Sequence, residues 1–268
     1  MTPLSATSSE LLVPRRFCGP PSSGNGGWTA GALAALIPHD CPEDRSRSWP
    51  TIRVALRQPP PLDSPLRVSE DDGSTVATFG GSVVARATVV EDRPMTVEPV
   101  SPAEARAASA TYPGHTSHPC PTCFACGTDR GEGDGLRIFP GRVADQDGPD
   151  QQSRVRVAAT WSPHPSVGED FHAYADELPR ASLATTWAAL DCIGGWAGDL
   201  TERLMVLAGM TARVDALPVI GEQHVVVGLA LGQEGRKTFT ASTLYDADGR
   251  VVACAEHVWV AVDPATFA

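Results

Sequence analysis

Two segments of this 268-residue chain combine a helix start, small residues and an acidic side chain in a way that could build one active site. The first, Gly24 to Ala34, is a small-residue turn that leads into an apolar helix without an acid. The second, Ser182 to Asp191, is a similar apolar helix with one acid at its far end. The leading amides of a helix have no helical partner and lie at the positive end of its dipole. The first segment therefore offers hydrogen-bond donors, and the second offers a carboxylate.

Hydrolysis at a carbonyl group needs donors aimed at the carbonyl oxygen and a base or nucleophile opposite them. We predict a composite catalytic group formed by Asn25, Gly26, Gly27 and Asp191. The glycine amides would hold the carbonyl oxygen, Asn25 would cap the helix or orient water, and Asp191 would activate water or attack directly. Burial, and a helix end just before Gly194, would raise the pKa of Asp191. The alternative is a structural aspartate bonded to a loop amide.

Four neighbours are predicted to bind substrate: Trp28, Thr185, Thr186 and Trp187. The two threonines could hold the attacking water, or they could bond back to a carbonyl one turn earlier. An apolar pocket lined by Trp28, Leu33, Trp187 or Leu190 is expected beside the catalytic group. The Asp191 carboxylate is expected roughly 4 to 7 Å from the Gly26 or Gly27 amide, a gap that one water bridges.

The seven cysteines suit reduced thiols, because no apolar secretory segment accompanies them. A tetrahedral zinc site could form within one cluster of possible ligands, namely His115, His118, Cys120, Cys123 and Cys126. The alternative is a structural turn without metal, and we expect no metal. Cys192 is interpreted as a buried, inert thiol, and His224 and His257 as structural residues of strands.

A net charge of −11 opposes attraction to phosphate backbones, and Lys237 is the only lysine among 21 basic residues. Nucleic acid is therefore not an expected partner. No apolar run approaches the ~20 residues that cross a bilayer. We therefore expect no contact with a membrane. We expect a cytoplasmic location.

Each half of the chain is predicted to run helix, strand, proline-containing break and three further strands. The first half has a helix near residues 26–37 and strands near 51–56, 66–68, 74–79 and 82–90. The second half has strands at 136–139 and 154–159, a helix at 182–191, and strands at 207–215, 224–230, 238–245 and 251–262. A polar loop at 144–153 separates the predicted strands 136–139 and 154–159. We predict repeats at 1–95 and 120–268, joined by a linker at 96–119.

Several motifs resemble the hotdog fold of acyl-CoA thioesterases. They are Cys123-Phe124-Ala125-Cys126-Gly127, Asp134-Gly135-Leu136, Arg236-Lys237, the turn Asp246-Ala247-Asp248-Gly249, and Trp259. The resemblance implies an α+β double hotdog, two repeats that each wrap an antiparallel sheet around a central helix. It covers most of 120–262 and, more weakly, 17–90. Asn25 stands where many such enzymes have histidine before Gly-Gly.

The resemblance implies an acyl-CoA thioesterase-like hydrolase with one composite site between the repeats. The mirror site, Ser182 with Ala34, would lack chemistry. The expected partner is an acyl-CoA or acyl-carrier thioester, so coenzyme A enters only as part of the substrate and no other cofactor is expected. A homo-oligomer through the sheets is allowed. The alternatives are a non-catalytic acyl-thioester-binding protein and a hotdog hydratase or dehydratase, although the Asp-x-Asn-Pro stretch of that branch is absent.

Overall fold

A computed structural model describes residues 9–37, 49–148, 152–169 and 176–267 of the chain. Its main feature is an 11-stranded antiparallel sheet in the order β1-β3-β4-β5-β2-β10-β13-β12-β11-β9-β6. A separate two-stranded hairpin pairs β7 with β8. Pro38 and Cys41 lie outside the described residues.

The strands and helices have the following bounds. The strands are β1 (Ser9–Leu11), β2 (Ile52–Leu56), β3 (Leu66–Asp71), β4 (Ser74–Phe79), β5 (Ser82–Val89), β6 (Gly141–Arg142), β7 (Gln146–Asp147), β8 (Ser153–Arg154), β9 (Arg156–Trp161), β10 (Met205–Val214), β11 (His224–Glu234), β12 (Lys237–Tyr245) and β13 (Val251–Ala261). The α-helices are α1 (Gly26–Ala34), α2 (Pro102–Ala110) and α3 (Leu183–Ala197). Short 3-10 turns span Arg15–Phe17, Pro113–His115, Pro165–Val167 and Pro264–Phe267.

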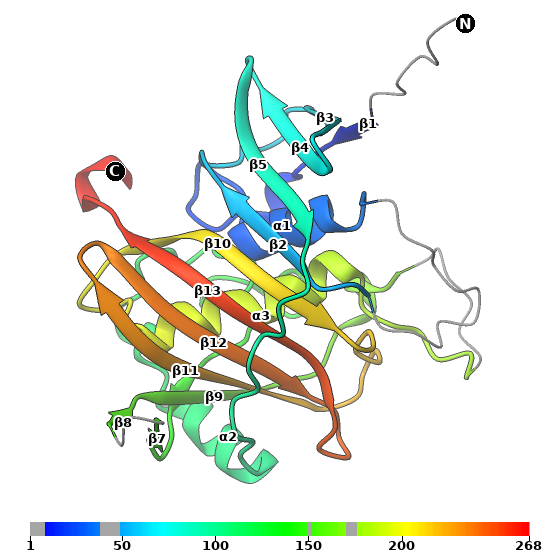
Figure 1. The fold of residues 1–268 in the computed structure, drawn as a ribbon. Helices are drawn as coiled ribbons and strands as arrows, with labels where there is room; N and C mark the ends of the chain where they lie inside the picture. The colour runs from blue at the N-terminus through cyan, green and yellow to red at the C-terminus, as the bar shows by residue number, and fades with distance from the viewer. Residues whose placement is uncertain (1–8, 38–48, 149–151, 170–175, 268) are drawn as a thin grey trace, which may run out of the picture.

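The two halves of the sheet meet where β2 pairs with β10. Ala55 lies opposite Gly209 and Ile52 opposite Ala212 in this seam. All strands on one side of the seam come from residues before Val90, and all strands on the other side come from residues after Pro140. The seam therefore joins two parts of the chain into one continuous sheet (Figure 1).

The helices α1 and α3 pack against each other and against the sheet. Helix α3 contacts β11, β12 and β13, and α1 contacts β2, β5 and β10 (Figure 1). Almost every side chain of α3 is buried, as expected for a helix covered on one side by a sheet and on the other by a second helix. Leu33, Trp187, Leu190 and Ile193 are among the fully buried side chains of this core.

Close approach of the two helices depends on glycine. A Cβ on Gly31 would lie 2.7 Å from the Trp187 Cβ and 2.8 Å from the Ala184 Cα. These are contacts with the backbone and the root of a side chain, so a methyl group there forces the helices apart. We expect Gly31→Ala to lower the free energy of unfolding by about 1–3 kcal/mol, the usual cost of overpacking a core. Denaturant titration measures this loss.

Gly131→Ala is the matched control, because nothing lies within 4 Å of a Cβ built there. Equal free energies of unfolding for Gly31→Ala and Gly131→Ala would contradict the packing described for α1 and α3.

Three segments differ from the sequence-based expectation. The strand predicted at 136–139 is wrong, because these residues form no strand. Leu136 and Ile138 instead bond to the carbonyls of Phe124 and Ala125, and Arg137 between them has a φ of 56°. The stretch 96–119 contains helix α2, which packs against β9. The polar stretch near 144–153 contributes β7 and β8, the short hairpin.

Candidate functional site

Asp191 lies in the interior of α3, as the ninth of its fifteen residues. The expectation of a helix end just before Gly194 is wrong, because the helix continues through Gly194 and Gly195 to Ala197. The dipole of a helix end therefore does not act directly on this carboxylate. Asp191 is only 2% exposed, and burial is the main cause that raises its pKa to about 7.

The Asp191 carboxylate is bound directly to the start of α1. Its Oδ2 accepts hydrogen bonds from the Gly27 amide at 2.9 Å and from Asn25 Nδ2 at 3.0 Å. The two helix segments therefore meet. The prediction of a water between the Asp191 carboxylate and the glycine amide is wrong, because the two groups bond directly. The reason is the missing side chain of Gly27, since a Cβ there would lie 2.4 Å from the Asp191 Cβ. Both hydrogen bonds oppose the rise in the Asp191 pKa.

Asn25 holds both parts of this arrangement. Its Oδ1 accepts from the Trp28 amide at 2.8 Å, which makes it the N-cap of α1, while its Nδ2 donates to Asp191. An asparagine can make both contacts because it has an acceptor and a donor on one rigid amide. Asn25 therefore fixes the position of the carboxylate relative to the helix start.

We expect Asn25→Ala to lower the free energy of unfolding by about 0.5–2 kcal/mol, because it removes an N-cap. The matched control is Ser101→Ala, which removes the N-cap of α2, a helix whose cap bonds to Glu104 and not to Asp191. If Asn25 also positions Asp191, only Asn25→Ala will lower kcat for any substrate that the chain turns over. Chemical denaturation and steady-state kinetics together separate the two effects. Equal kcat in both variants would contradict the positioning role.

The second carboxylate oxygen, Asp191 Oδ1, is buried and has no hydrogen-bond partner among the described residues. A buried polar atom without a partner is rare and calls for an explanation, such as a role in catalysis. Asp191 also lines a cavity, so a water or ligand there could supply the missing contact.

The cavity beside Asp191 has a volume of about 470 Å³. It lies at one end of the seam between β2 and β10, and its size falls in the usual range of ligand pockets. Its lining includes Asn25, Gly26, Leu56, Pro59, Pro60, His118, Cys120, Cys123, Cys126, Asp191, Cys192, Leu200, Met205, Leu207, Ala208, Trp259 and Val262. Three of the four predicted catalytic residues therefore line this cavity, and Gly27 is not among its lining residues.

The predicted pocket lining needs correction. Trp28, Thr185, Thr186 and Trp187 are absent from the residues that line this cavity, as are Leu33 and Leu190. Trp28 stacks on Phe17 with ring centroids 4.1 Å apart, and Trp187 packs against Gly31 between the helices.

The two threonines take part in the helix start. Thr186 Oγ1 donates to the Ser182 carbonyl at 3.0 Å, so it makes the bond one turn back that is the common arrangement for threonine in a helix. Thr185 Oγ1 accepts from the Ser182 hydroxyl at 2.9 Å. Both hydroxyls thus bond at the N-terminal end of α3, six and five residues before Asp191.

Three cysteine side chains meet in the same cavity. The sulfur atoms of Cys123, Cys126 and Cys192 all lie within 4.8 Å of one another, and those of Cys123 and Cys192 are 3.6 Å apart. Cys192 is buried, as expected, but its sulfur faces the other two. No local pattern in the sequence indicates this, because Cys192 comes from α3 and is 66 positions after Cys126.

The two histidines of the predicted zinc group make different contacts. His118 Nε2 is 3.4 Å from the Cys126 sulfur and 3.1 Å from its carbonyl. His115 instead contacts the Ser109 carbonyl. The sulfur of Cys120 is not part of the three-cysteine group, although this residue lines the cavity.

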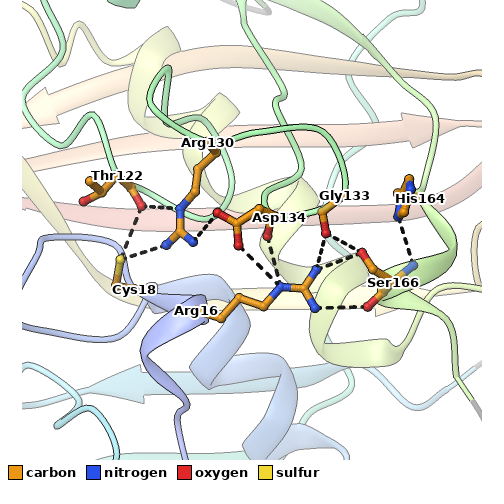
Figure 2. Close-up of polar contacts among 8 residues, drawn as sticks. All are labelled: Arg16, Cys18, Thr122, Arg130, Gly133, Asp134, His164 and Ser166. Carbon is orange, nitrogen blue, oxygen red and sulfur yellow. Dashed lines mark hydrogen bonds and ion pairs between the residues drawn. The ribbon is translucent and has the colours of Figure 1, made fainter.

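Two arginines hold the segment that contains Cys123 and Cys126 against the N-terminal part of the chain (Figure 2). Arg130 donates to the Thr122 carbonyl at 2.7 Å and to the Cys18 sulfur at 3.0 Å. Arg16 donates to the Gly133 carbonyl at 2.7 Å and to the Ser166 hydroxyl at 2.8 Å. These contacts are largely charge-assisted, which makes them stronger than neutral ones.

A backbone link completes this attachment. The Phe124 amide donates to the Cys18 carbonyl at 2.7 Å, and the Asn25 amide donates to the Phe17 carbonyl at 2.8 Å. The cysteine segment and the start of α1 are therefore joined through two consecutive residues, which sets the cysteines beside Asn25.

A second cavity, of about 520 Å³, is lined by Arg137, Trp161, His164, Val167 and neighbouring residues. It contains none of the predicted site residues. His164 Nδ1 accepts from the Ser166 amide at 3.1 Å, which is a local helix cap. The chemistry therefore points to the cavity beside Asp191 in spite of its slightly smaller volume.

In the described part of the chain, no helix is both long enough and apolar enough to span a bilayer.

Comparison with known proteins identifies the fold. No protein-family model matches the sequence, and no curated protein matches it. Among solved structures, the acyl-CoA thioesterase II TesB2 of Mycobacterium marinum is similar over 95% of this chain and 92% of its own, with a TM-score of 0.52 and 11% identity. The tesB protein of Mycobacterium avium subspecies paratuberculosis is similar over 91% and 90%, with a TM-score of 0.54 and 12% identity.

A protein described as having a hot dog fold, from Alicyclobacillus acidocaldarius, is similar over 97% of this chain and 95% of its own. Its TM-score is 0.55 and its identity is 13%. At such identities a likeness extends to architecture and not to individual residues. The large antiparallel sheet, the helices packed on it and these three likenesses together show that the chain has the hotdog fold.

Proposed function

We propose that the chain is an acyl-thioester hydrolase with a single active site at the cavity beside Asp191. One observation supports this above the others. A buried carboxylate lines an apolar cavity, with one oxygen fixed by Asn25 and Gly27 and the other without a partner. A fixed, partly unsatisfied carboxylate suits a general base or nucleophile that acts on a substrate held in that cavity.

The proposed architecture is a double hotdog with repeats at 1–95 and 120–268, joined by 96–119. The sheet order supports this division, because the strands of each repeat follow one another in the same relative chain order on both sides of the seam. Outward from the seam the strands are β2, β5, β4, β3, β1 on one side and β10, β13, β12, β11, β9 on the other. In chain order the helix α1 precedes β2 as α3 precedes β10.

The proposed repeats explain why there is one site. Asn25 and Ser182 are the N-caps of α1 and α3, so they are equivalent positions. The position equivalent to Asp191 is then Ala34, which has no functional group. The start of α1 therefore faces an acid on α3, whereas the start of α3 has no acid at the equivalent position of α1.

The proposed chemistry uses the Asp191 Oδ1 atom against the thioester carbonyl carbon, either through a water or directly. Because the Gly27 amide already donates to Asp191, it is not a free donor to the carbonyl oxygen. Gly26 lines the cavity and lies in the first turn of α1, whose amides lack helical partners. Gly26 is therefore the proposed donor to the oxyanion.

The apolar wall of the cavity supports an acyl substrate. Leu56, Leu200, Met205, Leu207 and Trp259 all line it. Two of the similar structures are named as thioesterases or as a tesB protein, which agrees with a thioester substrate. Coenzyme A or a carrier protein would be the leaving thiol.

A second candidate is a protein that binds an acyl thioester without hydrolysing it. The commitment of the Gly27 amide to Asp191 favours it, because a single remaining amide stabilises an oxyanion less than a pair does. In that case Asp191 would position the helix start and would not react.

A panel of acyl-CoA thioesters that differ in chain length tests the proposal, with released thiol as the readout. We expect thiol release above the uncatalysed rate for at least one member, and saturation with rising substrate. Binding by calorimetry without thiol release would favour the second candidate. Neither binding nor release across acyl-CoA and acyl-carrier thioesters would reject both.

A further inference from the structure

The three sulfur atoms beside Asn25 have the separations of ligands around one metal ion. A tetrahedral zinc site with zinc–sulfur distances of about 2.3 Å places its sulfurs about 3.8 Å apart. The Cys123 and Cys192 sulfurs are 3.6 Å apart, and the Cys126 sulfur lies within 4.8 Å of both. Small side-chain rotations would suffice to bring all three within bonding distance of one ion.

The local backbone gives Cys123 and Cys126 the form of a ligand-bearing turn. Their spacing, with two residues between, lets one tight turn present both sulfurs to the same ion. The Gly127 amide donates to the Cys123 carbonyl at 2.9 Å. A Cβ on Gly127 would lie 2.5 Å from the carbonyl oxygens of Cys123 and Pro121, so only glycine lets the chain fold back here.

N–H groups surround the sulfurs as donors. Asn25 Nδ2 is 3.8 Å from the sulfurs of both Cys123 and Cys192. The backbone amides of Ala125 and Cys126 also bond to the Cys123 sulfur. Among the contacts of the described residues, Arg130 is the arginine that donates to a cysteine sulfur, and that sulfur belongs to Cys18. The Cys123 sulfur therefore accepts from several N–H groups, and among the contacts of the described residues no side-chain cation bonds any of the three sulfurs.

From this placement we infer that Cys123, Cys126 and Cys192 bind one zinc ion, with the fourth position facing the cavity. Thiolates are soft ligands that select such thiophilic ions, and the cavity gives the ion a path of entry. His118 is a neighbour of the site and not its fourth ligand. Its Nδ1 accepts from the Cys120 amide at 2.9 Å, so in the neutral ring the proton is on Nε2, the nitrogen near Cys126. Water therefore takes the fourth position.

The sequence alone favoured a turn without metal at Cys123 and Cys126. The new element is Cys192, which the packing of α3 brings to the two cysteines of the turn. The inference does not depend on hydrolase activity, because its readouts are metal content and spectra.

Elemental analysis of the full chain, purified without chelators, tests the inference directly. We expect about one zinc per chain, a loss of at least tenfold in Cys192→Ser, and full retention in Cys254→Ser. Cys254 is the matched control, because it is buried and its sulfur contacts the Pro94 carbonyl, away from the group. Circular dichroism of each variant checks that it is folded.

Cobalt titration of the metal-free parent chain keeps the test decisive if Cys192→Ser does not fold. We expect thiolate-to-cobalt charge-transfer absorption that saturates at one equivalent and disappears when zinc is added. Two results would overturn the inference. One is a folded parent chain with neither bound zinc nor the cobalt absorption. The other is a disulfide between Cys123 and Cys192 found by non-reducing peptide mapping of freshly purified protein.

Discussion

Replacing Asp191 by asparagine is expected to lower thioester turnover at least ~10²-fold, the usual scale for losing a general base. Asparagine keeps the shape of the side chain, and its carbonyl oxygen can still accept from Asn25 and the Gly27 amide, as Oδ2 does now. What is lost is the basic oxygen that has no partner, on a residue that lines the cavity. Steady-state kinetics on the best acyl-CoA substrate of the parent chain gives the comparison.

Asp248→Asn is the matched control, because it makes the same chemical change at an exposed turn. The Asp248 carboxylate pairs with Arg250 at 2.9 Å, and both side chains are more than 70% exposed, so the pair adds little to stability. We expect parental turnover in this control. Near-parental turnover in Asp191→Asn, with the fold intact, would remove Asp191 from the proposed mechanism.

The two central helices and most of the strands could be predicted because their signals are local. The helix starts at Asn25 and Ser182 follow from capping residues placed before apolar helices. The strands 74–79 and 82–90 follow from alternating, β-branched stretches, and the structure has β4 and β5 there. These patterns depend on a few consecutive residues, so no tertiary information was needed.

The details that failed depend on contacts between distant residues. Nothing in the sequence around Gly27 shows that its amide will bond to a carboxylate 164 positions away, which requires the exact separation of two packed helices. The segment 136–139 has a strand pattern, but the turn at Phe124 and Ala125 takes its hydrogen bonds. Local propensity yields to tertiary context in such a case.

The position of Cys192 shows the same limit. Helical spacing indicates which residues share its face of α3, but not what that face meets. The neighbouring cysteines come from an irregular segment that Arg16 and Arg130 hold in place. Polar contacts from a 3-10 turn and a loop have no periodicity that sequence analysis could detect.

The stability of the chain is expected to depend on pH through His257, which is fully buried beneath α3. Its Nδ1 lies 3.2 Å from the Thr240 hydroxyl, and its Nε2 lies 3.5 Å from the Ser242 hydroxyl. Burial lowers the pKa of His257 from 6.5 to about 4, and the groups that oppose this shift are backbone atoms of Thr240 and Leu190, which are uncharged. The native state therefore holds this imidazole neutral.

A depressed native pKa fixes the sign of the effect. The unfolded chain takes up the proton near pH 6.5, and the native state takes it up only near pH 4, so stability from this group is complete above pH 6.5 and falls as the pH drops between these values. The full loss is on the order of 3 kcal/mol, since each pKa unit corresponds to about 1.4 kcal/mol. Denaturant titrations of the parent chain and of His257→Gln at pH 7 and at pH 4.5 measure it.

The difference between the two proteins isolates His257, because every other titrating group is common to both. At pH 7 the variant is expected to be the less stable, since it loses the packing of the ring and its contacts with Thr240 and Ser242. Toward pH 4.5 the parent chain alone has to keep a buried imidazole neutral, so the gap should narrow by about 2–3 kcal/mol. A gap that stays constant over this range would mean that His257 is protonated in the native state or is reached by water, in contradiction to its complete burial.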